Sequence, residues 1–321
     1  MNLKNKYLMI ILAVIIIKTN FSINVQAKEY NRFNNISIED GLSQATVETM
    51  MQDSKGYIWL GTNDGLDRYN GYTFKKYSYE KGQENSLVNG YILDIKEDSE
   101  GNIWVATAAG ISKIYNNGEK VQNYTSDSES GNLSNDNTAT MLISSSNKIY
   151  VGTAEGINLY DKKTDKFNLI YPELKEEYIN SLAEDKYGNI WAGTENGLYK
   201  INVGTNVIER FESTDDVNTI SENYIYKVYY DGDKHIWIGT YDNGFCKLNI
   251  ENNKVTRYLQ TREDGTIRGA FVKNFLKDSK GNMWICTDEG VVLFEVDKNI
   301  FTWYENKVHD PHSLIDNNTF S

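Results

Sequence analysis

A unit of about 46 residues recurs along the chain, and no other feature of the sequence limits the fold so strongly. Each copy contains an aromatic residue, an aliphatic residue or alanine, a small residue and a threonine. The aromatic residues are Trp59, Trp104, Tyr150, Trp191, Trp237 and Trp284, and they are spaced by 45, 46, 41, 46 and 47 residues. A regular period of this length is typical of folds that repeat one supersecondary unit.

Each copy of the unit predicts four short strands. In the first copy, β-branched and aromatic residues favour strands at Val47–Gln52, Tyr57–Thr62, Leu66–Tyr69 and Thr73–Tyr77. Glycine-containing turns separate these segments, as expected for tight hairpins. Four hairpin-linked strands repeated every 40 to 50 residues are the signature of a propeller blade. No segment shows the pattern of a helix after residue 28.

The sequence therefore predicts an all-β fold, a seven-bladed β-propeller of four-stranded antiparallel blades. Six complete blades are expected at about residues 42–79, 87–126, 133–171, 174–213, 220–260 and 267–306, and residues 314–321 are expected to start a truncated seventh. The aliphatic residues Leu42, Leu87, Leu133, Leu174, Ile220, Ile267 and Leu314 are expected to open the first strand of each blade.

Ring closure explains an unusual segment near the start of the chain. Residues 30–34 carry the apolar pair that marks every fourth strand, Tyr30 and Phe33, but no strands precede them. We expect this segment to be a closing strand that completes the last blade and covers both sheet edges. A six-bladed ring is disfavoured because the sixth blade already has its own fourth strand at Phe301–Tyr304.

The first 27 residues resemble a secretory signal peptide. Lys4 and Lys6 precede an apolar run at Leu8–Ile17, and Val25-Gln26-Ala27 provides small residues for cleavage. The run is shorter than the roughly 20 residues that cross a bilayer. Residues 1–27 are thus predicted to be a signal peptide and residues 28–321 an extracytoplasmic propeller at the cell surface or in the periplasm; the alternative is an uncleaved N-terminal anchor.

Composition excludes several classes of protein. The net charge of −12 argues against nucleic acid or anionic lipid as a partner, because no basic patch is available to neutralise phosphates. Cys246 and Cys286 are too few for a disulfide framework or a cysteine zinc site, and the three histidines lack ligand spacing. We expect free thiols, no cofactor, no metal and no catalytic residues.

A candidate ligand site follows from aligning the copies on their aromatic residue. The residue thirteen positions earlier, expected near the channel axis, is aromatic in four copies: Tyr91, Tyr178, Tyr224 and Phe271. Two positions before these lie polar residues, among them Asn89, Asn135, Glu176 and Glu222. Aromatic faces beside amides and carboxylates suit a small polar ligand, neutral or cationic, such as an oligosaccharide or peptide. Alternatively, the aromatic residues plug the channel and the polar residues cap loops.

The repeat resembles the two-component regulator propeller repeat. Asp-x-x-Gly-x-Ile-Trp-x-Gly-Thr-x-x-Gly-Leu occurs at residues 53–66 and 185–198, and the segment Ile38–Gln44 resembles the start of the first blade in that family. Tyr150, Ala106 and Cys286 depart from the pattern, as does the turn at Ser144–Asn147, which places the regularity of the third blade in question.

The resemblance implies an extracytoplasmic, ligand-sensing propeller of a membrane-bound receptor. Its output would be a histidine kinase or a diguanylate cyclase outside this chain. It further implies membrane contact only through the export signal or a C-terminal anchor, and a homodimer formed through other regions. Two alternatives stay open: a secreted scaffold for protein–protein interaction, and a propeller lyase or hydrolase. For an enzyme, His235 is expected on the opposite face, and Arg268 beside Glu222 fits either a catalytic pair or a salt bridge at the rim.

Overall fold

The computed structural model describes residues 33–127, 132–260 and 267–321. The predicted signal peptide and residues 30–32 of the predicted closing strand lie outside the described residues. The chain divides into two compact units, Met1–Phe33 and Asn34–Ser321, and every strand of the described residues belongs to the second unit. Among the described residues, no helix has the length and apolar character needed to cross a membrane.

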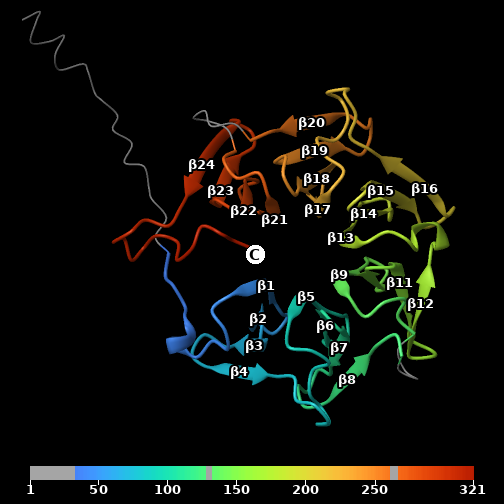
Figure 1. Cartoon of the computed structure of the whole chain (residues 1–321), viewed down its shortest axis with the longest axis vertical. Coiled ribbons are helices and arrows are strands. Elements are labelled where there is room, and N and C mark those ends of the chain that lie inside the picture. The colour runs from blue at the N-terminus through green and yellow to red at the C-terminus, as the bar shows by residue number, and fades with distance from the viewer. Residues whose placement is uncertain (1–32, 128–131, 261–266) are drawn as a thin grey trace, which may run out of the picture. The chain divides into compact units, whose positions relative to one another are not determined.

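The second unit contains six four-stranded antiparallel sheets arranged around a centre (Figure 1). We call these sheets blades one to six. Blade one comprises β1 (Val47–Gln52), β2 (Ile58–Thr62), β3 (Gly65–Tyr69) and β4 (Phe74–Tyr77). Blade two comprises β5 (Ile92–Glu97), β6 (Ile103–Thr107), β7 (Gly110–Ile114) and β8 (Val121–Tyr124). Blade three comprises β9 (Thr138–Ile143), β10 (Ile149–Thr153), β11 (Gly156–Asp161) and β12 (Lys166–Ile170).

The second half of the ring repeats this order. Blade four comprises β13 (Ile179–Glu184), β14 (Ile190–Thr194), β15 (Gly197–Asn202) and β16 (Val207–Phe211). Blade five comprises β17 (Ile225–Tyr230), β18 (His235–Thr240), β19 (Phe245–Asn249) and β20 (Val255–Tyr258). Blade six comprises β21 (Val272–Lys277), β22 (Met283–Thr287), β23 (Gly290–Glu295) and β24 (Ile300–Tyr304). Two short 3-10 helices, η1 (Ile38–Asp40) and η2 (Pro172–Leu174), are the helical elements of the described residues.

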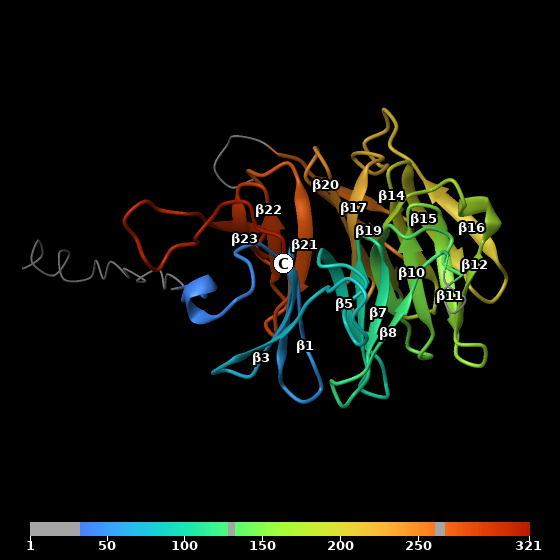
Figure 2. The ribbon, with the colours of Figure 1, turned by 60° about the horizontal axis from the view of Figure 1, so that its bottom comes forward.

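Within each blade the strands pair in chain order, so the first strand lies innermost and the fourth outermost (Figure 1). Six complete four-stranded blades were predicted, and the structure confirms them. Both views place the C-terminal end between β21 and β1 (Figures 1 and 2). The described strands end with β24, the fourth strand of blade six, and include no strand of a further blade.

The prediction that seven aliphatic residues open the first strands was wrong. In the six complete blades each first strand begins five residues after its aliphatic residue, at Val47 after Leu42 and at Ile92 after Leu87, for example. Six of the aliphatic residues are instead buried in the segments that connect blades: Leu42, Leu87, Leu133, Leu174, Ile220 and Ile267. Leu87 packs with Trp59 of the preceding blade. The prediction failed because buried connections and buried strands both require apolar side chains, so an apolar residue alone does not distinguish them.

The repeated aromatic residue joins neighbouring blades. Trp104 of blade two packs against Leu133, Met141 and Phe167 of blade three, and Trp191 of blade four packs likewise on blade five. The small residue two positions later is required by the same packing. A Cβ at Gly61 would lie 2.6 Å from the Ile92 side chain of the next blade. The repeated aromatic residue is thus part of the core in five copies, whereas Trp284 is only half-buried.

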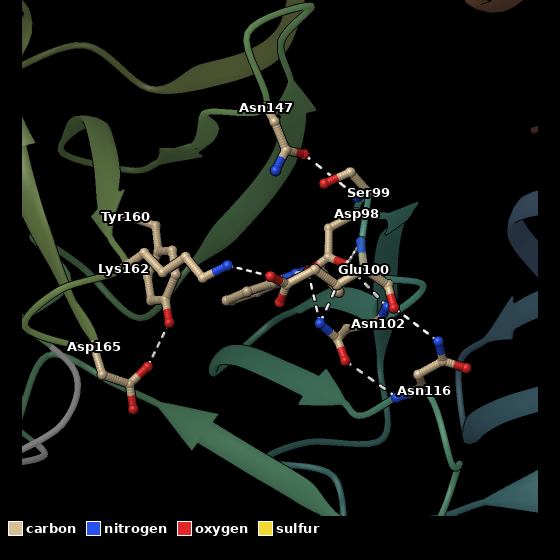
Figure 3. Close-up of polar contacts among 10 residues, drawn as sticks. Asp98, Ser99, Glu100, Asn102, Asn116, Asn147, Tyr160, Lys162 and Asp165 are labelled. Atoms are coloured by element: carbon tan, nitrogen blue, oxygen red, sulfur yellow. Dashed lines mark hydrogen bonds and ion pairs between the residues drawn. The ribbon is translucent and has the colours of Figure 1, made fainter.

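The turn before the aromatic residue begins with an aspartate that accepts a hydrogen bond from the tryptophan side chain. In blade two, Trp104 donates its indole N–H to Asp98 at 2.8 Å, while the Asp98 carboxylate also accepts from the backbone and side chain of Asn102 (Figure 3). Blades one and four have the same indole–carboxylate bond at 2.8 and 2.9 Å. The turn glycine adopts a positive φ, +75° at Gly101, which explains why glycine recurs there.

Blade three is regular despite its unusual turn. Ser144 takes the place of the aspartate, and its hydroxyl accepts from the backbone N–H of Lys148 at 3.0 Å. Asn147 replaces the glycine with a φ of +59°, a conformation that asparagine tolerates. Tyr150 is buried where the other blades have tryptophan. The question raised by the sequence about this blade is therefore answered by a complete four-stranded sheet.

Candidate functional site: the axial cavity

A bulge recurs near the start of every inner strand. In β1 the pairing with β2 passes from Val47 to Thr49, which leaves Glu48 without a partner in the ladder. The same irregularity occurs in all six inner strands, and the bulged residues are Glu48, Leu93, Ala139, Asn180, Tyr226 and Lys273. Because two residues then oppose one, consecutive side chains reach the same face of the sheet. The bulges thus direct two side chains of one strand toward the centre of the ring.

These side chains line a cavity of about 150 Å³ at the centre of the ring. All six inner strands contribute to it. The lining residues are Glu48, Thr49, Leu93, Asp94, Ala139, Thr140, Tyr178, Asn180, Tyr226, Lys227, Lys273, Asn274 and Phe320. Most of them carry polar atoms, which is unusual for residues of buried strands. A cavity of this kind, with a few convergent polar groups, is the default binding-site hypothesis for the fold.

Two lysines and two carboxylates give the cavity its charge. Asp94 is buried and already engaged: it forms an ion pair with Lys96 at 2.6 Å and accepts from the backbone N–H of Met141 at 2.8 Å. Burial raises the pKa of Glu48, while the nearby Lys273 ammonium lowers it. Burial likewise lowers the pKa of Lys227 and that of Lys273. The cavity therefore holds its cations at a desolvation cost, which an anionic group would offset.

The two cavity lysines differ in their surroundings. Lys273 is 5% exposed, donates to the Asn318 side chain, and has its ammonium 3.8 Å from the centre of the Phe320 ring. Lys227 has no hydrogen-bond or ion-pair partner within the described part of the chain; its nearest opposite charge is Asp94. Lys227 is thus the cation that the cavity leaves available.

The aromatic residues proposed from the sequence fall in three places. Tyr178 lines the cavity and donates to the Asn137 side chain at 3.2 Å. Tyr224 stacks on Tyr241 at 4.9 Å between ring centres, and Tyr241 lies 4.8 Å from Phe271. Phe271 in turn contacts Tyr226 edge-on at 4.6 Å, so this aromatic row ends at the cavity.

Tyr91 is the fourth of these aromatic residues and is 40% exposed. Burial of part of its ring raises the pKa of Tyr91, and the neighbouring Glu48 and Tyr178 raise it further. Tyr91 therefore lies at the edge of the cavity rather than inside it. All four residues immediately precede an inner strand, one position earlier than expected, because the strands begin at Ile92, Ile179, Ile225 and Val272.

The polar residues proposed from the sequence mostly stabilise their own loops. Asn89 and Asn135 each accept, at 2.8 Å, from the backbone N–H two residues later. Glu222 accepts from the backbone N–H of Asp242 at 2.9 Å. Glu176 is exposed. These contacts favour the loop-capping alternative for Asn89, Asn135 and Glu222.

Most residues that line the cavity were not predicted from the sequence. The signal was present: the second and third positions of the inner strands carry Glu48, Asp94, Asn180, Lys227 and Lys273 among strongly apolar neighbours. A strict two-residue alternation would place consecutive side chains on opposite faces. The bulge that brings both toward the centre depends on the register with the second strand, which composition alone does not encode.

The cysteines, histidine and arginine considered as disulfide partners or catalytic residues make other contacts. Cys246 and Cys286 are free thiols, as predicted, although only Cys246 is fully buried. His235 opens β18 and contacts Asp231, while Arg268 forms an ion pair with Glu305 at 2.7 Å rather than with Glu222. Among the described residues, no group of three histidine, cysteine, aspartate or glutamate side chains is arranged to hold a metal ion.

Repeated four-stranded antiparallel sheets around a polar axial cavity define a β-propeller. The family model described as "Two component regulator propeller" matches the chain at residues 41–64, 86–109, 173–196 and 219–242. Each match spans the connection into a blade, its inner strand and the aromatic–x–small–Thr segment. The chain therefore carries the two component regulator propeller repeat, as the resemblance in the sequence indicated.

A curated relative shares a short part of the sequence. Histidine kinase P4 of Formosa agariphila is 35% identical over 74 residues, which are 23% of this chain and 5% of that protein. The chain thus corresponds to a small part of the length of this relative.

Solved structures share the fold. The extracellular domain of a putative hybrid two component system from B. thetaiotaomicron is 20% identical, with a TM-score of 0.78, over 91% of this chain and 39% of that chain. PorZ, a surface component of the type-IX secretion system of Porphyromonas gingivalis, is 16% identical with a TM-score of 0.60, over 78% and 38%. A streptogramin B lyase structure is 15% identical with a TM-score of 0.57, over 77% and 78%. At these identities the likeness concerns the fold alone.

Proposed function

We propose that the chain is the extracytoplasmic, ligand-sensing propeller of a membrane-bound signal-transduction receptor with a histidine kinase or diguanylate cyclase as its output. One observation carries this proposal: the chain combines two component regulator propeller repeats with a fold that matches the extracellular domain of a putative hybrid two component system over 91% of its length. The sequence similarity to a histidine kinase supports the same class of receptor. Fold alone does not determine function, so the proposal rests on the repeat as well.

A ring with seven blade positions is part of the proposal, and Thr319 supports it. The Thr319 hydroxyl accepts from the Thr287 backbone N–H at 3.1 Å and donates to the carbonyls of Thr287 and Gly290 at 3.0 and 3.1 Å. Thr138, the first residue of β9, makes the same three contacts with blade two. Thr319 thus has the contacts of a residue that begins the inner strand of a blade following blade six.

Exposure of the blade faces supports the same arrangement. Met50 of blade one is 49% exposed, whereas Ile95 at the same position of blade two is 1% exposed. On blade six, Trp284 and Val291 are half-buried, while the corresponding Trp104 of blade two is fully buried. Blades one and six therefore each have an apolar face without a sheet against it in the described part of the chain. A seventh blade, completed by the predicted closing strand, would cover both.

The ligand is proposed to bind at the channel, through Tyr91, Tyr178, Tyr224 and Phe271 at its edge and the axial cavity below them. The aromatic row from Tyr224 to Tyr226 provides flat surfaces of the kind that sugar rings and peptides use. We propose no enzymatic role, no cofactor and no nucleic-acid partner for this chain. A protein-binding scaffold is the second candidate.

The reading frame of the gene that encodes this chain tests the receptor proposal. The expected result is a frame that leads to a complete ring, a transmembrane helix and a kinase or cyclase domain, with the receptor recovered in the membrane fraction. A frame that encodes only a propeller would overturn the receptor proposal and favour the scaffold. For the ligand, simultaneous alanine substitution of the four aromatic residues is expected to abolish the response of the full receptor; an intact response would overturn the site.

A further inference from the structure

The axial cavity contains a group of hydrogen-bond donors that the chain does not satisfy. Lys227 contributes an ammonium, and no described side chain or carbonyl accepts a hydrogen bond from it. Asn274, also in the cavity lining, uses its side-chain oxygen to accept from the Phe275 backbone at 3.0 Å, which leaves its amide N–H₂ available. Tyr226 adds a hydroxyl, and burial raises the pKa of that hydroxyl to about 12, so it stays protonated and able to donate.

These donors lie on adjacent inner strands. Tyr226 and Lys227 are consecutive in β17, and Asn274 lies in β21 of the next blade. Consecutive residues of a regular strand would point to opposite faces, but the bulge at Tyr226 brings both into the cavity. Three donors from two adjacent inner strands therefore line the same cavity.

The acidic residues of the cavity do not satisfy these donors. Asp94 already accepts from Lys96 and from two backbone N–H groups, those of Ile95 and Met141. Glu48 faces Lys273, whose ammonium also donates to Asn318 and lies on aromatic rings. An unpaired ammonium in a partly dehydrated cavity costs free energy, whereas a carboxylate bound to it forms strong, charge-assisted hydrogen bonds.

We infer that the axial cavity binds the carboxylate of a small acidic ligand, which Lys227 holds together with Tyr226 and Asn274. The volume of about 150 Å³ is the share of about five water molecules, so the site takes a small acid or the acidic sugar of a longer ligand rather than a chain threaded through the ring. This inference rests on the proposed ligand-sensing function and names the chemical class of its ligand. It adds an acidic group to the polar ligand expected at the channel.

The test measures binding of three probes to the purified chain by isothermal titration calorimetry. Glucuronate and acetate carry the carboxylate, and glucose is the neutral counterpart of glucuronate. Both acids are expected to bind, and glucuronate is expected to bind at least about tenfold more tightly than glucose, the worth of one charge-assisted hydrogen bond. Equal binding of glucose and glucuronate, or no binding of either acid, would overturn the inference.

Variants separate a binding role from a structural role. Lys227→Met is expected to weaken glucuronate binding at least about tenfold, while Lys227→Arg keeps binding within a few-fold. The matched control is Lys113→Met, which removes a buried lysine outside the cavity, whose ammonium lies 4.9 Å from the centre of the Trp104 ring, and leaves binding unchanged. Because Lys227→Met removes an unpaired buried charge, its melting temperature without ligand is expected to be equal or higher. Unchanged glucuronate binding by Lys227→Met would overturn the assignment.

The two proposals fail in different ways. If the full receptor with Lys227→Met still responds to its ligand at the same concentration, the carboxylate site is wrong and the receptor proposal stands. If the gene encodes no output domain but the chain binds glucuronate through Lys227, the receptor proposal is wrong and the carboxylate site stands.

Discussion

Blades two and five begin their second strands with turns that look alike in sequence but use the leading aspartate differently. In blade two, Asp98 accepts from the Trp104 indole at 2.8 Å and from the Asn102 side chain, as Figure 3 shows for the asparagine. In blade five, the corresponding Asp231 accepts from the ring of His235 at 3.0 Å. The Trp237 indole N–H is buried without a hydrogen-bond partner among the described residues.

The backbone of the two turns differs as well. Blade two closes its turn with a bond from the Gly101 N–H to the Asp98 carbonyl at 2.9 Å. In blade five the glycine with positive φ is Gly232, which directly follows the aspartate. At the position that corresponds to Gly101, the backbone N–H of Lys234 donates to the Asp231 side chain. In blade five the His235 ring thus bonds Oδ2 of the aspartate, the oxygen that accepts from both the indole and the asparagine side chain in blade two. Packing therefore retains the tryptophan even where its hydrogen bond is lost.

Removing the aspartates is expected to have the largest effect and to affect the two blades unequally. Asp98→Ala leaves the buried Trp104 indole and three other N–H groups without an acceptor, so we expect a loss of about 3 to 4 kcal/mol in the free energy of unfolding. Asp231→Ala is expected to cost about 1 to 2 kcal/mol less, because the N–H groups that bond Asp231 are exposed or half-buried, whereas the Trp104 indole is buried. Urea unfolding midpoints of the two variants measure the difference, and equal losses would contradict this explanation.

Replacing the tryptophans tests the hydrogen bond itself. Trp104→Phe removes the indole donor and leaves Oδ2 of Asp98 with the Asn102 side chain as its remaining donor, so we expect a loss of about 2 to 3 kcal/mol. Trp237→Phe removes a similar area of aromatic surface together with an unsatisfied N–H, and we expect it to cost about 1 kcal/mol less. The two urea midpoints again provide the measurement. A larger loss in blade five would show that Trp237 has a partner that the structure does not contain.

Exchanging the residue two positions before the tryptophan, His235 or Asn102, tests the comparison directly. His235→Asn gives blade five the asparagine of blade two, whose side chain shares one carboxylate oxygen of the aspartate with the indole. We expect a gain of about 0.5 to 1 kcal/mol in the free energy of unfolding and slower hydrogen exchange of the Trp237 indole N–H. The reciprocal change, Asn102→His, is the control and is expected to destabilise. If His235→Asn leaves the indole exchange unchanged, the histidine is not what displaces that bond.

The sequence predicted the parts of this fold that local chemistry determines. The strand predicted at Val47–Gln52 is β1 to the residue, because alternating apolar positions and a following aspartate–glycine turn both act within a few residues. Local patterns therefore sufficed for the six blades and for most strand boundaries of the first one.

The site was predicted less well, because its geometry comes from pairing between strands. The sequence pointed to Tyr91, Tyr178, Tyr224 and Phe271, and of these only Tyr178 lines the cavity. The bulge that brings Lys227 into the cavity depends on how β17 pairs with β18. Likewise, the sequence shows Lys234 at the position where blade two has Gly101. The contact of Asp231 with His235, however, depends on the altered turn.

The pH dependence of stability is the smallest effect expected from this comparison. Burial alone would raise the pKa of the Asp98 carboxyl, but hydrogen bonds from Trp104, Asn102 and a backbone N–H outweigh it and hold the pKa below its usual value. For Asp231, backbone and ring hydrogen bonds from His235 likewise outweigh burial, and its pKa is also lowered. Each of these two carboxyl groups thus binds a proton more weakly in the folded than in the unfolded chain.

A depressed pKa stabilises the fold fully above the unfolded value of about 3.9, and this stabilisation is lost as the pH falls through the folded value. Asp98→Asn and Asp231→Asn are therefore each expected to reduce the loss of stability seen between about pH 5 and pH 3, measured as urea midpoints at each pH. The effect in blade two depends on a neutral indole donor, whereas in blade five part of it depends on the histidine ring. His235→Asn combined with Asp231→Asn is accordingly expected to add little to Asp231→Asn below about pH 4, since the ring acts through that carboxylate. An additive effect of the two changes would mean that His235 stabilises blade five through another group.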